Sequence, residues 1–106
     1  MANNFRLYTK ANVGVTTETV YVGVTTATVI GITLANTSGS SINVGVGITR
    51  PVADDVYVLK NVPIPQGSSL EIMQGNKIVL ETSDSLTAIS DIASSLDVSV
   101  AVLEMT

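Results

Sequence analysis

Residues 41–50 read Ser-Ile-Asn-Val-Gly-Val-Gly-Ile-Thr-Arg, and this stretch decides the fold class. Every second residue from Ile42 to Ile48 is a β-branched aliphatic, and asparagine or glycine stands between them. Successive side chains of a strand point to opposite faces, so a period of two predicts a strand with one buried face. The same alternation returns near the C-terminus at Val98, Val100 and Val102. A chain built on this pattern is expected to be all-β.

The rest of the chain extends the pattern. Ala27–Ala35 is apolar almost throughout and is expected to be a strand covered on both faces. Further strands are expected at Phe5–Tyr8, Glu18–Val24, Val56–Asn61, Ser69–Met73, Lys77–Glu81 and Leu86–Ser90. Ser90–Ser95 is the only candidate for a helical turn. Eight or nine short strands in 106 residues predict a single antiparallel β-sandwich, either jelly-roll or immunoglobulin-like.

Turn residues separate these strands. Asn36–Ser40 is rich in serine and glycine and is expected to close a hairpin between its flanking strands. Gln74-Gly75-Asn76 is expected to form a tighter turn. Pro63 and Pro65 donate no backbone hydrogen bond, so Pro63–Gly67 is expected to cross between the two sheets.

A near-repeat precedes the first long apolar strand. Residues 13–20 read Val-Gly-Val-Thr-Thr-Glu-Thr-Val, and residues 22–29 repeat them with Ala27 in the place of Glu18. A third copy is missing, which disfavours a β-solenoid and favours two similar strands of one sandwich. The odd offset would put the copies on opposite faces of a continuous strand, so a bend, a bulge or a turn is expected between them, at Gly23.

The core is expected to consist of aliphatic side chains that recur with the strand period. They are Ile30, Ile32, Leu34, Val44, Val46, Ile48, Val58, Ile78, Leu80, Val98, Val100 and Val102.

Composition argues against several classes of function. The chain has no histidine and no cysteine, which removes the commonest general base, thiolate chemistry and the usual zinc ligands. Charged residues make up 13% of the sequence, the net charge is −4 and the cations are scattered. Nucleic acids and anionic membranes are therefore not expected as partners. Asp54-Asp55 and Ser83-Asp84-Ser85 lack the spacing of a calcium loop and are interpreted as turns. We expect no enzyme, no cofactor and no metal.

A small carbohydrate-binding module is an alternative, since such modules include β-sandwiches of this size. Sugar sites usually stack aromatic rings on the ligand, and this chain has no tryptophan. Tyr8, Tyr21 and Tyr57 could take that role if they gathered on one face of the fold.

The order of several strand sequences carries a resemblance. These are Thr19–Tyr21, Thr28–Thr37, Ile64–Leu70, Lys77–Glu81 and Asp97–Glu104. From about Glu18 onward, the chain resembles small virion proteins of tailed bacteriophages, particularly marine and cyanobacterial ones. The resemblance implies a particle component made in the host cytoplasm and located in the virion.

From this resemblance we expect a capsid decoration or cement protein that binds the major capsid protein or other virion proteins, as a homo-oligomer. A neck, tail or fibre-attachment component is the alternative within the same particle. Residues 1–15 are expected to be either an N-terminal arm or the first edge strand, and residues 16–106 the sandwich domain. Phe5, Leu7 and Tyr8 are the candidate partner-binding residues.

Overall fold

The computed structural model describes residues 3–51, 53–73 and 77–105, and these residues form nine strands and no helix. The strands are β1 (Asn3–Val13), β2 (Glu18–Val22), β3 (Ala27–Asn36), β4 (Ile42–Thr49), β5 (Val56–Ile64), β6 (Ser69–Glu71), β7 (Ile78–Leu80), β8 (Ser85–Ser90) and β9 (Leu96–Met105). The turn expected at Gln74-Gly75-Asn76 lies outside the described residues.

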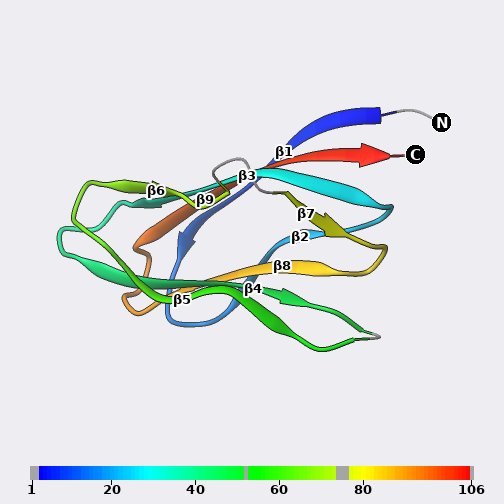
Figure 1. Cartoon of the computed structure of the whole chain (residues 1–106). Coiled ribbons are helices and arrows are strands. Elements are labelled where there is room, and N and C mark those ends of the chain that lie inside the picture. Colours follow the sequence, from blue (N-terminus) through cyan, green and yellow to red (C-terminus); the bar gives the residue numbers. More distant parts are fainter. Residues whose placement is uncertain (1–2, 52, 74–76, 106) are drawn as a thin grey trace.

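Two antiparallel sheets pack face to face (Figure 1). Sheet A has the order β1-β9-β3, and both β6 and β7 pair with the far side of β3. Sheet B has the order β2-β8-β4-β5. The predicted β-sandwich is confirmed.

The pairing distinguishes between the two sandwich types left open by the sequence. β1 pairs with β9, β2 with β8, β3 with β6 and β7, and β4 with β5. Successive pairs alternate between the two sheets, as if one long antiparallel ribbon had been folded around the core. This is the connectivity of a jelly roll, not of an immunoglobulin domain.

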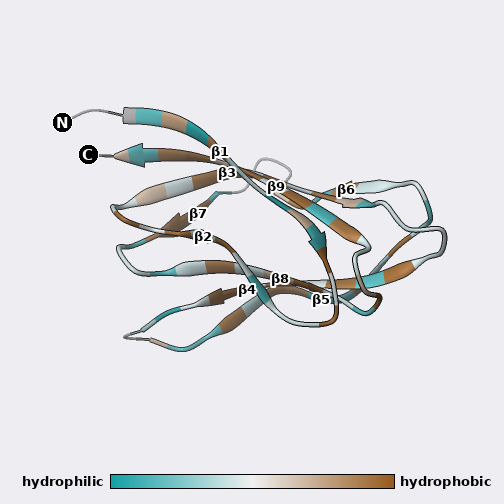
Figure 2. Cartoon of the chain, turned by 180° about the vertical axis from the view of Figure 1, so that it is seen from behind, coloured by the Kyte–Doolittle hydropathy of each residue, from teal (hydrophilic) through white to brown (hydrophobic). Residues whose placement is uncertain are grey.

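The core lies between the sheets and follows the predicted alternation. Buried and partly buried residues alternate along β8 and β9. Hydrophobic and hydrophilic residues also take turns along the edge strand β1 (Figure 2), but Phe5 and Leu7 on this strand are exposed. Of the expected core residues, those fully buried are Ile32, Leu34, Val44, Val46, Leu80, Val98, Val100 and Val102. Ile48, Val58 and Ile78 are partly buried against this cluster.

Ile30 was wrongly predicted to be in the core. The pairing of β3 with β9 shifts between Val29 and Gly31, which is a β-bulge. The extra residue changes the phase of the alternation, so Val29 and Ile32 point inward while Ile30 is 37% exposed. The outward-facing residues of β3 are otherwise only partly buried, so this strand is not covered on both faces as expected.

The near-repeat encodes two connections of the same kind. Residues 14–17 lead from β1 in sheet A to β2 in sheet B, and residues 23–26 lead from β2 back to β3. Gly14 and Gly23 occupy matching places and both contact the loops next to β8. The carbonyl of Gly14 accepts a bond from Ser90 N at 2.9 Å, and Gly23 N donates to the Asp84 carbonyl at 2.9 Å. The chain bends at Val24 and Thr25, directly after Gly23, so the expected break between the two copies is present.

Two other connections differ from expectation. Asn36–Ser40 does not close a hairpin, because β3 belongs to sheet A and β4 to sheet B. The buried Asn36 side chain organises this crossing by donating to the carbonyls of Ser40 and Ile64 at 2.8 and 2.9 Å. Ser90–Ser95 forms no helix: the chain bends at Asp91 and Ile92 and turns at Ala93 and Ser94, and the Ser90 and Ser95 hydroxyls lie 2.6 Å apart.

Pro63–Gly67 was expected to cross between the sheets. Pro63 and Ile64 are the last two residues of β5, so the crossing begins only after Ile64; β5 is an edge strand, where a missing N–H is tolerated. The chain then passes through Pro65 and Gly67 to β6 in sheet A, as the prolines predicted.

Candidate functional site

Strand β1 forms one edge of sheet A. Residues 3–13, which the sequence left open between an arm and an edge strand, pair with β9 from Asn3–Met105 to Lys10–Val98. The two ends of the described chain therefore lie side by side (Figure 1). The other edge of β1 has no strand partner among the described residues.

Apolar side chains gather on the outer face of sheet A at this end. Residues that pair directly across strands point to the same side. Phe5 pairs with Leu103, Leu103 with Thr28, and Thr28 with Val79, which gives one continuous row. We define the β1 patch as the apolar side chains of this row, the next row and the bulge: Phe5, Leu7, Ile30, Val79, Ala101 and Leu103.

The β1 patch is open to solvent over its largest side chains. Phe5 is 74% exposed, Leu7 67% and Val79 59%. The row that follows along β1 begins with Thr9 and Ser99 and is polar. An apolar surface with a polar border is typical of a protein-binding site.

Tyr8 lies on the opposite face of β1 from Phe5 and Leu7. Its hydroxyl donates to Glu104 Oε2 at 2.8 Å, and the hydroxyl of Tyr21 donates to the same oxygen at 2.9 Å. The two rings pack with their centroids 4.6 Å apart. Arg6 Nε lies 3.5 Å from the other carboxylate oxygen. Glu104 is buried, so this cluster ties β1 and β2 to β9.

Burial and the Glu104 carboxylate raise the pKa of Tyr21 well above its ordinary value, with burial the larger cause. For Tyr8 the hydrogen bond to Glu104 is the main cause of a raised pKa. Both phenols therefore remain neutral donors at physiological pH. Among the three candidate partner-binding residues, Phe5 and Leu7 face outward, and Tyr8 holds their strand in place.

The edge strand β1 is long and contains no proline. Natural edge strands are often shielded by lysine, proline, a bulge or short length. β5 carries Pro63, β6 and β7 are three residues each, and β2 is bulged against β8. The long strand β1 shifts register against β9 only near its end, between Lys10 and Val13, while Arg6 pairs with Glu104 and Lys10 Nζ lies 3.5 Å from Glu18.

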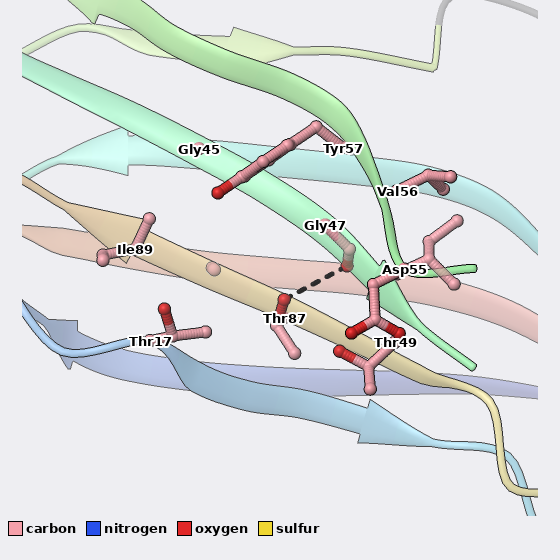
Figure 3. A pocket seen from close by; sticks show the side chains of 11 residues that line it. Thr17, Gly45, Gly47, Thr49, Asp55, Val56, Tyr57, Thr87 and Ile89 are labelled. Atoms are coloured by element: carbon pink, nitrogen blue, oxygen red, sulfur yellow. Dashed lines mark hydrogen bonds between the residues drawn. The ribbon is translucent and has the colours of Figure 1, made fainter. Parts of the chain in front are cut away.

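A second feature lies on the outer face of sheet B. Two adjoining cavities of about 220 and 350 Å³ share Gly45, Tyr57 and Ile89, and together we call them the β4 groove. Figure 3 shows Tyr57 reaching from β5 across β4 between Gly45 and Gly47. Tyr57 thus lies on the outer face of sheet B, whereas Tyr21 is buried and Tyr8 is partly buried against the core, so the three tyrosines do not gather on one face.

Beyond these two surfaces, two further kinds of feature were sought in residues 3–51, 53–73 and 77–105: a metal-binding cluster and a membrane-spanning helix. No group of three acidic side chains in these ranges is arranged to hold a metal ion. The same residues include no helix of the length and apolarity needed to span a membrane.

Comparison with known proteins shows the fold. No protein-family model and no curated protein sequence matches the chain. Among solved structures, one similar chain comes from Bacillus endospore appendages, described as a novel family of disulfide-linked pili. It has a TM-score of 0.59 and 11% identity over 98% of this chain and 87% of that chain. Another comes from the structure of infectious bursal disease virus strain Gx, with a TM-score of 0.56 and 16% identity over 95% of this chain and 33% of that chain.

Proposed function

We propose that this protein is a non-enzymatic structural subunit of a large particle, specifically a decoration or cement protein of a viral capsid. The β1 patch is the observation that carries the proposal. It places exposed apolar side chains directly beside the free edge of a long strand, so one surface offers both hydrophobic area and backbone hydrogen bonds to a neighbour.

The physical basis is addition of a strand to a sheet. The unpaired N–H and C=O groups of β1 can pair with an extended segment of a neighbouring subunit, and Phe5 and Leu7 then contact side chains of the same segment. Covering apolar surface contributes about 25 cal/mol per Å². Because many copies would bind to one particle, contacts that are individually modest would together give stable attachment.

The comparisons support a role in assembly, because the similar folds belong to a pilus protein and to a chain of a virus structure. The contacts would differ from those of the pili in one respect. The present chain contains no cysteine, so its own contacts to neighbours would be noncovalent. The proposed partners are the major capsid protein or other virion proteins, with a second copy of the chain as a further neighbour in a homo-oligomer.

Copy number on purified virus particles tests the proposal. Quantitative mass spectrometry should find the chain at a fixed, high ratio to the major capsid protein. A count of only a few copies per particle would favour the neck, tail or fibre-attachment alternative. Absence from the particles would overturn a virion role.

A rebinding assay tests the surface. Particles stripped of the chain are incubated with wild-type protein, with the double variant Phe5→Ser/Leu7→Ser, or with Tyr57→Ala as a matched control. Both sets of side chains are exposed, so all three proteins should fold. The double variant should lose occupancy and Tyr57→Ala should keep it. Equal occupancy by all three would show that the β1 patch is not the contact.

A further inference from the structure

The β4 groove owes its shape to two glycines. Gly47 pairs with Thr87 on one side and Tyr57 on the other, so its missing side chain would point outward. A Cβ at Gly47 would lie 3.2 Å from the Val56 carbonyl, and one at Gly45 would lie 3.3 Å from Ile89 Cγ2. Both positions are too crowded for a side chain without adjustment, and both glycines are buried, so the backbone of β4 forms the floor of the groove beneath the side chains of its neighbours.

Tyr57 provides an aromatic surface over this floor. A Cβ at Gly47 would be 3.8 Å from Tyr57 Cδ1, so the ring rests close to the β4 backbone. Tyr57 is nevertheless 63% exposed, and Lys60 Nζ lies 5.1 Å from the ring centroid. The ring therefore divides the groove, and its face away from Lys60 offers apolar area to a ligand.

Hydrogen-bonding groups stand at both ends of the groove. Asp55 and Thr49 line the first cavity with Thr87. Asn43, Asn61 and Asp91 line the second. Aromatic, hydroxyl, amide and carboxylate groups alternate over a short distance, which suits a ligand that is apolar on its faces and polar at its rim.

Other kinds of ligand fit this lining poorly. β4 is already paired with β5 and β8, so the floor offers no free strand edge to a peptide. The carboxylates of Asp55 and Asp91 and the net charge of −4 disfavour nucleic acid. The open, half-polar lining does not enclose an acyl chain in the way that apolar pockets do.

We propose that the β4 groove binds a short neutral oligosaccharide, with one sugar ring stacked on Tyr57 and hydroxyls of the chain hydrogen-bonded to Asp55 in one cavity and to Asn43 in the other. This site lies on sheet B, whereas the β1 patch lies on sheet A, so the proposal does not depend on the assembly role. A particle protein with both surfaces would attach through one sheet and present a glycan-binding site on the other.

Amide chemical shifts of the ¹⁵N-labelled protein test the proposal. The probes are short neutral oligosaccharides of glucose, galactose, mannose, xylose or N-acetylglucosamine. They are added to about 10 mM, so that binding with a millimolar dissociation constant is detected. At least one should shift the amide signals of Gly45, Gly47 and Thr87. No shift with any probe would overturn the proposal. Equivalent shifts on raising the protein concentration without sugar would assign the groove to a second copy of the chain and also overturn it.

Variants then separate stacking from other effects. Tyr57→Ala should weaken saccharide binding about tenfold or more, because it removes the aromatic contact. Tyr57→Phe keeps the ring and should bind as the wild type does. Phe5→Ala, which removes an exposed ring from the other sheet, is the matched control and should leave binding unchanged. Equal binding by Tyr57→Ala and wild type would exclude stacking on this residue.

Discussion

Replacing Glu104 by leucine should loosen the attachment of β1. The carboxylate accepts the hydroxyls of Tyr8 and Tyr21 on one oxygen and faces Arg6 with the other. These residues lie on β1 and β2, so removing the acceptor affects the strand that presents the β1 patch.

The size of this destabilisation follows from how deeply the hydrogen-bonding partners of Glu104 are buried. A hydrogen bond to a charged group contributes about 1.5–3 kcal/mol, and a buried donor left without an acceptor costs about 1–3 kcal/mol. Tyr21 is fully buried and Tyr8 is half-buried. The Arg6 side chain is 59% exposed, so its ion pair adds at most about 1 kcal/mol. Glu104→Leu should therefore destabilise by about 3–5 kcal/mol, and Glu104→Gln, which keeps one acceptor oxygen, by about 1–2 kcal/mol.

Urea unfolding monitored by circular dichroism measures these differences. Glu18→Gln is the matched control, because Glu18 also bridges β1 and β2 through Lys10 but is partly exposed. It should cost no more than about 0.5 kcal/mol. Native-state hydrogen exchange should also show faster opening of β1 than of β8 in Glu104→Leu.

A triple variant tests whether the unsatisfied tyrosine hydroxyls cause the loss of stability. Adding Tyr8→Phe and Tyr21→Phe to Glu104→Leu removes the unsatisfied hydroxyls and should recover part of the lost stability. If Glu104→Leu costs no more than Glu18→Gln, or if the phenylalanines recover nothing, the carboxylate does not hold the cluster together.

Two more predictions concern pH and packing. The raised pKa values of Tyr8 and Tyr21 mean that the unfolded chain ionises first, near the ordinary value of 10.0, so stability should be full below that pH and fall above it. The measurements are phenolate absorbance and urea unfolding across this pH range, in a Tyr57→Phe background that leaves only these two phenols. A constant free energy of unfolding through this range would contradict the prediction. Gly23→Ala would place a Cβ 2.8 Å from a backbone carbonyl of the β7–β8 loop and should cost about 1–3 kcal/mol. Gly39→Ala has no atom within 4 Å of its Cβ and should be nearly neutral in the same thermal or urea unfolding, so equal effects would refute the packing argument.

The candidate site could be predicted only in part. Phe5 and Leu7 stand out in the sequence as apolar residues in a polar N-terminal stretch, and the structure places both on an exposed face. The inward position of Tyr8 was not predictable, because alternation separates two faces without saying which one is covered at a sheet edge. The β4 groove was also missed, although Gly45 and Gly47 on the polar face of a strong strand were its visible signal.

The sequence by itself determined the local structure of this protein. Alternation from Ile42 to Ile48 and from Val98 to Val102 specified strands, because the period of two is a property of the extended backbone. The prolines at 63 and 65 specified an edge and a crossing for the same local reason.

Only the tertiary structure decided how the strands are shared between the sheets. Asn36–Ser40 has the composition of a hairpin yet joins two sheets, since pairing partners are chosen by long-range packing. Ile30 became exposed through a bulge against β9. Glu104 meets Tyr8 and Tyr21 across separations of 96 and 83 residues. Such contacts depend on burial and hydrogen bonding among distant segments, which no local pattern encodes.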